Sequence, residues 1–236
     1  MEKVKDIFSD TKYDKSLTNR KKDNVRSLRM EKAFDVIYRE KGYNIRRERR
    51  RKQQFAGTDV YIEGAPWANN KCVIIDEKVA TDYKHAYVNL KSFCIELLCK
   101  NNPGQLGWIF KKDSVTDYYI FAWVDTDDDF RTIKAIEYVV VERKKILELL
   151  RSVGIKSRNT AKYLIDTKGK PGKNCNKYYS ISKDYRMVLS NKMEEPLLFV
   201  VNRDYLKKIA VDVVEYNYDQ WKALVEKDAK RFGETA

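Results

Sequence analysis

Residues 57–80 read GTDVYIEGAPWANNKCVIIDEKVA and contain the most informative pattern for the fold. Two short apolar runs, Thr58 to Ile62 and Cys72 to Ala80, flank the segment EGAPWANNK. Apolar runs of this length, separated by Gly, Pro and Asn, are typical of two strands joined by a loop. The sequence therefore predicts a pair of neighbouring antiparallel strands at this point in the chain.

The second strand carries charged residues inside an apolar run. Because strand side chains alternate, Asp76 and Lys78 should share one face of the strand, while Glu77 points to the other face with its apolar neighbours. An acid and a lysine within CVIIDEKVA would be costly to bury without a purpose. This placement favours a functional site, with the residue Asp59 on the adjoining strand as a third member.

Oxygen ligands of this kind suit a hard divalent cation. Mg²⁺, with Mn²⁺ as a substitute, would lie between Asp59, Asp76 and the main-chain carbonyl of Glu77, and Lys78 would hold or help deprotonate an attacking water. Two alternatives stay open. Asp59 could be a turn residue that bonds its own backbone, and Asp76 and Lys78 could lie on an ordinary exposed strand face.

An amphipathic helix precedes these strands. Its apolar residues recur at helical spacing until Lys41-Gly42, which predicts a helix of about four to five turns. Those residues are Val25, Leu28, Ala33, Phe34, Val36 and Ile37. Glu31 borders the buried face of this helix.

Basic residues are concentrated before the candidate site. The chain holds 48 Lys and Arg against 35 Asp and Glu, a formal charge of +13 that would attract a polyanion such as nucleic acid. One basic block leads directly into the first strand, and we predict that it contacts phosphates, the alternative being a solvated charged face. The predicted contacts are Arg46, Arg47, Arg49, Arg50, Arg51, Lys52 and the nearby Gln54.

The order of these motifs resembles the PD-(D/E)XK superfamily of restriction-endonuclease-like nucleases. The matching residues are Gly57-Thr58-Asp59 and, seventeen residues after Asp59, Asp76-Glu77-Lys78, preceded by the helix that carries Glu31. Thr58 stands where the motif has its name-giving proline, and the acid of the second half is aspartate. The similarity covers about residues 25–125.

The resemblance implies an α/β (α+β) fold, with a restriction-endonuclease-like core built on a central mixed β-sheet flanked by helices. It also implies a Mg²⁺-dependent phosphodiesterase, with a DNA endonuclease as the favoured form, and a catalytic role for Glu31 on the first core helix. A homodimer would supply two sites for the two strands of a duplex and is retained as a hypothesis. The alternatives are a nucleic-acid-binding protein without catalysis, and a mobile-element protein that acts on a protein–nucleic acid complex.

The remaining chain divides into shorter predicted elements. Residues 90–100 and 144–153 have helical spacing, residues 106–110, 118–124, 136–141 and 197–201 are predicted strands, and 205–209 is a predicted helix. Residues 167–177 contain TKGKPGKNCNK, which predicts a flexible loop.

Composition limits the class of protein. A hydrophobic content of 43% over 236 residues is enough for a full core. We expect a basic N-terminal segment at 1–24, a nuclease core at 25–150 and an α/β extension at 151–236, which together could form one domain. No long apolar run is present and the first residues are charged, so we expect a cytoplasmic protein without membrane association.

Overall fold

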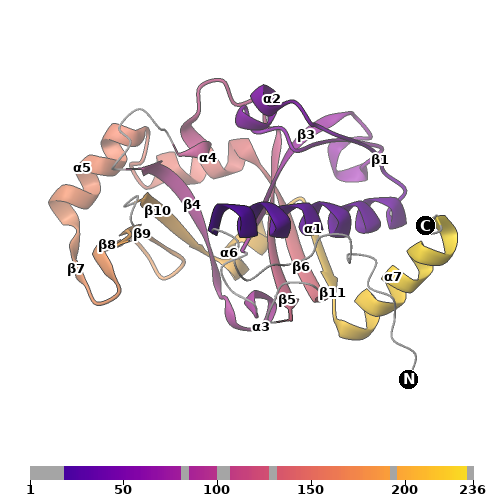
Figure 1. Cartoon of the computed structure of the whole chain (residues 1–236). Coiled ribbons are helices and arrows are strands. Elements are labelled where there is room, and N and C mark those ends of the chain that lie inside the picture. The colour runs from indigo at the N-terminus through magenta and orange to yellow at the C-terminus, as the bar shows by residue number, and fades with distance from the viewer. Residues whose placement is uncertain (1–18, 81–84, 100–106, 128–131, 192–195, 233–236) are drawn as a thin grey trace.

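The computed structural model describes residues 19–80, 85–99, 107–127, 132–191 and 196–232. Most of the predicted basic segment 1–24 therefore lies outside the described residues. Two β-sheets and their covering helices form the described part of the chain (Figure 1).

The larger sheet has six strands and holds the motif residues. From one edge to the other its strands are Asn44–Arg47 (β1), Val60–Glu63 (β2), Val73–Val79 (β3), Tyr118–Thr126 (β5), Ile133–Glu142 (β6) and Asp212–Tyr216 (β11). Only β3 and β5 run parallel to each other, and every other neighbouring pair is antiparallel. The predicted antiparallel pair around residues 57–80 is confirmed, and the sheet is mixed.

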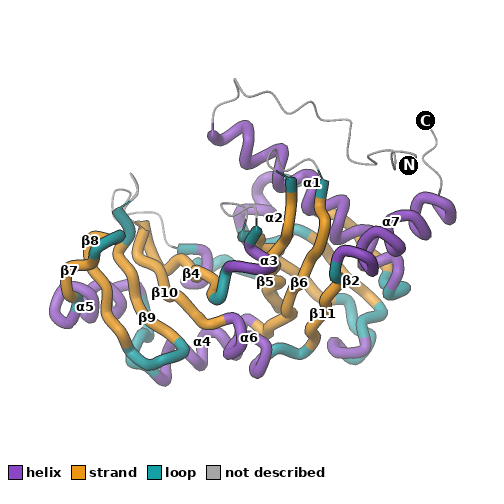
Figure 2. Tube along the Cα trace, turned by 90° about the horizontal axis from the view of Figure 1, so that it is seen from below, coloured by secondary structure: helices purple, strands orange, loops and turns teal. Residues whose placement is uncertain are grey.

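The second sheet has five strands, all in antiparallel pairs. In spatial order they are Ser92–Cys99 (β4), Pro196–Asn202 (β10), Tyr185–Leu189 (β9), Cys175–Ser180 (β8) and Lys170–Gly172 (β7). The two sheets lie next to each other (Figure 2).

Seven helices and two short 3₁₀ turns are found among the described residues. The helices are Asn19–Glu40 (α1), Arg51–Phe55 (α2), Ala86–Asn89 (α3), Arg143–Ser152 (α4), Arg158–Lys168 (α5), Arg203–Ile209 (α6) and Tyr218–Phe232 (α7), and the turns are Pro66–Ala68 (η1) and Trp108–Phe110 (η2). The predicted helices before Lys41-Gly42, at 144–153 and at 205–209 correspond to α1, α4 and α6.

The strands β5 and β6 are buried on both faces. On one face Ile120, Ala122 and Val124 join a core with α1 and α7, and on the other Tyr119, Phe121 and Trp123 join a core with α4, α5 and the second sheet. Strands covered on both faces are expected to be continuously apolar, as the sequence FAWV at 121–124 is. The fold is therefore α+β, with a mixed central sheet flanked by helices.

Three predicted elements are wrong. The predicted helix at 90–100 is replaced by the strand β4 at Ser92–Cys99, because Phe93, Ile95 and Leu97 alternate into the core and the backbone pairs with β10. The predicted strand at 106–110 is the 3₁₀ turn η2, apart from Leu106, which lies outside the described residues. The predicted loop at 167–177 contains the end of α5 and the hairpin of β7 and β8.

The predicted boundary at residue 150 does not separate the two sheets. The strand β11, from the predicted extension, pairs with β6 of the motif sheet, and β4, from the predicted core, pairs with β10. Both segments therefore contribute to both sheets. No helix in the described ranges is long and apolar enough to cross a membrane.

The strand β4 makes a prediction about stability. Replacement of the fully buried Ile95 by Ala should lower the free energy of unfolding by roughly 2–5 kcal/mol, because it leaves a cavity in the core. The neighbouring exposed Cys94 should tolerate Ala with a change of about 0.5 kcal/mol or less. Urea denaturation of both variants checks this, and equal losses would contradict the strand.

Candidate active site

A cavity of about 350 Å³ lies between α1 and the ends of β2 and β3. Glu31 from α1, Asp59 before β2, and Glu77 and Lys78 from β3 all line it. Four of the residues predicted from the sequence are thus brought to one place, although Glu31 and Lys78 are 47 positions apart in the chain.

Asp59 is fixed by the backbone around it. Its N–H donates to the carbonyl of Ile75 at 3.0 Å, and its carbonyl accepts from the N–H of Glu48 at 2.9 Å. Its side-chain Oδ2 accepts from the N–H of Glu77 at 2.7 Å. The carboxylate of Asp59 therefore bonds to β3 rather than to its own turn, which argues against the alternative of a strand-end turn residue.

Two features of the backbone require a glycine at position 57, two residues before Asp59. Gly57 has a φ of +83°, in the region that favours glycine, and an added Cβ would lie 2.3 Å from Oγ1 of Thr116. The same Cβ would lie 3.4 Å from Oδ2 of Asp76. Oγ1 of Thr116 donates to the carbonyl of Gly57 at 2.7 Å, so this glycine lets the chain approach both Thr116 and the candidate site closely.

Asp76 and Lys78 share a face of β3, as alternation predicts. Nζ of Lys78 lies 2.5 Å from Oδ1 of Asp76, whose side chain is almost wholly buried. Burial raises the pKa of Asp76 to about 7, with Lys78 lowering it and the nearby Asp59 raising it. An ordinary exposed strand face, the second alternative, does not describe the buried Asp76 and its half-buried partner Lys78.

The amine of Lys78 is strongly held in its charged form. Burial lowers its pKa, but the carboxylates of Asp76 and Asp59 outweigh burial and raise it overall. Nζ also lies 5.3 Å from the ring centroid of Trp108, in reach of a cation–π contact. Attraction to Lys78 is therefore too weak to keep Asp76 acidic, while the two acids are strong enough to keep Lys78 protonated.

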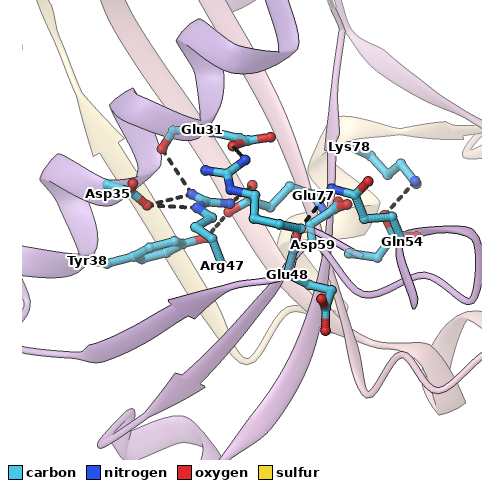
Figure 3. Close-up of polar contacts among 11 residues, drawn as sticks. Glu31, Asp35, Tyr38, Arg47, Glu48, Gln54, Asp59, Glu77 and Lys78 are labelled. Atoms are coloured by element: carbon cyan, nitrogen blue, oxygen red, sulfur yellow. Dashed lines mark hydrogen bonds and ion pairs between the residues drawn. The ribbon is translucent and has the colours of Figure 1, made fainter. Parts of the chain in front are cut away.

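The side chain of Glu77 points the opposite way, into a network under α1 (Figure 3). Its carboxylate accepts from Nη1 of Arg47 at 2.5 Å and from the hydroxyl of Tyr38 at 2.7 Å. Burial raises the pKa of Glu77 to about 7, although Arg47 lowers it. Since these partners occupy the side chain, the peptide group is what Glu77 presents to Asp59.

Arg47 is the centre of that network. Its guanidinium also pairs with Oδ1 of Asp35 at 2.7 Å and donates to the carbonyl of Glu31 at 2.9 Å, and its side chain is only 9% exposed. The structure therefore favours a structural role for Arg47 over the predicted phosphate contact.

Two further predicted nucleic-acid contacts, Arg46 and Arg49, lie at the surface. Arg46 stacks over the ring of Tyr61 at 3.8 Å, and Nη1 of Arg49 pairs with Glu31 at 2.6 Å. The side chain of Arg49 is 62% exposed, so this pair can open at little cost.

The remaining members of the block flank α2. Arg50 pairs with the buried Glu48, Lys52 is exposed, and Nε2 of Gln54 donates to the carbonyl of Glu48 at 2.9 Å. The side chain of Arg51 lies outside the described residues. Of the predicted block, Arg46, Arg49, Arg50 and Lys52 present exposed cations.

The donor set is compatible with a hard divalent cation, although its side-chain ligands are few. Within the described residues, no group of three or more His, Cys, Asp or Glu side chains is arranged to hold a metal ion. Burial is the main cause of the raised pKa of Asp76, and the neighbouring carboxylate of Asp59 adds to it. Together with the Glu77 carbonyl, the two carboxylates provide oxygen ligands that fit Mg²⁺, which usually keeps several waters.

Sequence reasoning missed the residues that surround the motif. Tyr38, Asp35 and Trp108 carry no local signal, because their roles depend on the packing of α1 and η2 against β3. The pairing of Arg47 with Glu77 could have been suspected only once both were placed on strands of one sheet. No family model, no curated protein and no solved structure matches this chain.

Two neighbouring arginines of β1 test the network. Arg47→Ala should lower the free energy of unfolding by roughly 3–5 kcal/mol, because it leaves the buried Glu77 without its counter-charge. Arg46→Ala loses a surface contact with Tyr61 and should cost about 1 kcal/mol or less. Chemical denaturation of both variants measures the difference, and a small effect at Arg47 would refute the structural role.

Proposed function

We propose that this chain is a metal-dependent nuclease with a restriction-endonuclease-like core, which hydrolyses phosphodiester bonds, with DNA as the favoured substrate. The observation that carries the proposal is the contact of Asp59 with the β3 backbone, beside the ion pair of the buried Asp76 with the half-buried Lys78. Buried ionisable groups that perturb each other inside or beside a cavity are a common feature of active sites.

The order of elements supports the same proposal. A helix with an acid, a strand with Asp59, and a neighbouring strand with Asp76 and Lys78 are followed by β5, parallel to β3. This arrangement agrees with the sequence resemblance to the PD-(D/E)XK superfamily. The mixed sheet is flanked by helices on both faces, as that resemblance implies.

Each residue would have a distinct task. Asp59, Asp76 and the carbonyl of Glu77 would hold Mg²⁺, which when bound offsets negative charge on the phosphate and favours ionisation of water. Lys78, kept protonated by its acidic neighbours, would donate hydrogen bonds to the attacking water or to a phosphate oxygen. Its charged state favours this role over proton abstraction in the metal-free protein.

Glu31 and the exposed arginines would act around that centre. Glu31 lines the cavity from α1 and is held by Arg49 at the surface. A phosphate arriving at Arg49 would compete for that arginine and release the Glu31 carboxylate toward the cavity. Arg46, Arg50 and Lys52 would hold further phosphates, and their contribution would weaken as salt rises.

The central test is cleavage by matched variants. Asp59→Asn, Asp76→Asn and Lys78→Met should each lower the rate of cleavage of plasmid DNA in Mg²⁺ or Mn²⁺ by at least about 100-fold, while DNA binding persists. Asp219→Asn, at the exposed start of α7, provides a control with the same chemical change and should cleave normally.

Supercoiled, linear and branched DNA and RNA should be compared, with EDTA as the metal-free condition. Full activity in Asp76→Asn would exclude this site. Binding of the wild-type protein to every substrate without cleavage would instead favour the non-catalytic nucleic-acid-binding protein.

The raised pKa of Asp76 gives a pH prediction. Because its pKa is about 7, the carboxyl is protonated below that pH, and the proton must leave before a cation can bind. Mn²⁺ affinity should therefore fall by up to about tenfold per pH unit below about pH 7 and level off above it. Calorimetric titration at several pH values measures this, and an affinity independent of pH would contradict the assignment of Asp76 as a ligand.

A further inference from the structure

A second cavity, of about 180 Å³, lies between η2 and the helix α4. Its apolar wall includes Ile109, Leu147 and Ile155, and all of its charged lining residues are basic. These residues are Lys111, Lys112, Arg143, Arg151 and Lys156. A concave surface lined by cations and no acids attracts anions strongly.

Three of the cations of this cavity differ from those cations elsewhere in the protein that are paired with acids. Elsewhere Arg39 pairs with Asp228, and Lys227 pairs with Glu40. Within the described part of the chain, no carboxylate forms an ion pair with Lys112, Arg151 or Lys156. Like charges gathered without counter-charges destabilise the folded state, so an external anion would relieve their repulsion.

Arg143 adds an unused hydrogen-bond donor. Its Nη2 lies 3.4 Å from the carbonyls of Ile109 and Lys111, which is long for a hydrogen bond. Its Nε is buried and has no hydrogen-bond partner in the described structure. The guanidinium therefore contributes its positive charge to the cavity, and the weakly bonded Nη2 would be its donor to an acceptor such as a phosphate oxygen.

A short series of side chains connects this cavity to the candidate active site. Trp108 lies 5.3 Å from Nζ of Lys78, and its ring packs against Tyr119 with centroids 4.7 Å apart. Tyr119 is opposite Asp76 in the β3–β5 pairing, and both Asp76 and Arg143 influence the pKa of its buried phenol. The two sites are therefore separated by the layer of Trp108 and Tyr119.

We infer that the η2–α4 cavity binds backbone phosphates of the nucleic acid whose scissile phosphate would lie at Asp59, Asp76 and Lys78. The inference deepens the proposed function and rests on it for the position of the scissile phosphate. Five cations exceed the charge of one phosphate, which favours a polyanion over a small anion. The nucleic-acid strand would run from the cavity at α1, past Trp108, to the cavity at α4.

A pair of charge reversals tests the cavity without requiring cleavage. The double variant Arg151→Glu/Lys156→Glu changes two exposed side chains, so the fold should persist. Its affinity for a fluorescein-labelled DNA duplex in EDTA, measured by anisotropy, should fall at least about tenfold. The slope of log affinity against log salt should also decrease by about 2, because two phosphate contacts are lost.

The matched control is Lys222→Glu/Lys230→Glu on α7, which makes the same change in net charge. Both lysines are exposed, and α7 packs on the opposite face of the six-stranded sheet. Its affinity should change much less than that of the cavity variant. Equal weakening in the two variants would overturn the inference, as would a wild-type protein that does not bind the duplex.

A single reversal, Lys112→Glu, approaches the cavity from η2 and should weaken binding in the same direction, and unchanged affinity would count against the inference. Circular dichroism confirms that each variant is folded.

The two proposals can fail separately. Selective loss of binding in the cavity variants, with no cleavage by the wild-type protein in Mg²⁺, would support the cavity and refute the nuclease. Cleavage by the wild-type protein, together with equal DNA binding by both double variants, would support the nuclease and refute the cavity.

Discussion

The buried guanidinium of Arg47 is the interaction on which the candidate site depends. It joins three elements, because it pairs with Asp35 on α1, extends from β1 and binds Glu77 on β3. A buried charge of this kind is tolerated only when its partners are well placed. With the side chain of Glu77 held under α1, the register of β3 is fixed, and Asp76 and Lys78 must point to the other face.

The fixed direction of the Glu77 side chain also explains how two acids with different surroundings, Asp76 and Glu77, follow each other on one short strand. Glu77 has a full set of donors, whereas Asp76 has one cation and a second acid nearby. Burial raises the pKa of both carboxyls to about 7, and the charge of Asp59 adds to the rise in each, but only Glu77 accepts hydrogen bonds from both an arginine and a tyrosine. The strand thus separates a structural acid from a candidate ligand by a single position.

The sequence predicts the motif region better than the rest of the fold. Asp59, Asp76 and Lys78 could be placed because strand alternation and two adjacent runs are local features. The strand β4 was mistaken for a helix since its apolar residues fit both periods, and only pairing with β10, about a hundred residues later, decides between them. For a similar reason the sequence predicts a phosphate contact for Arg47, because the partners on α1 and β3 that favour a structural role are distant in sequence.

The division of the sheet into two faces also accounts for the arrangement of charge. On the α1 face, the buried Arg47 is paired with Asp35 and Glu77, so its charge contributes to stability rather than to the attraction of an anion from solution. On the α4 face, the cations around η2 lie without acids among the residues that line their cavity. The cluster of cations at this cavity would attract an approaching polyanion before any contact forms. The aromatic layer of Trp108 and Tyr119 would then separate capture of the strand from chemistry at Asp76.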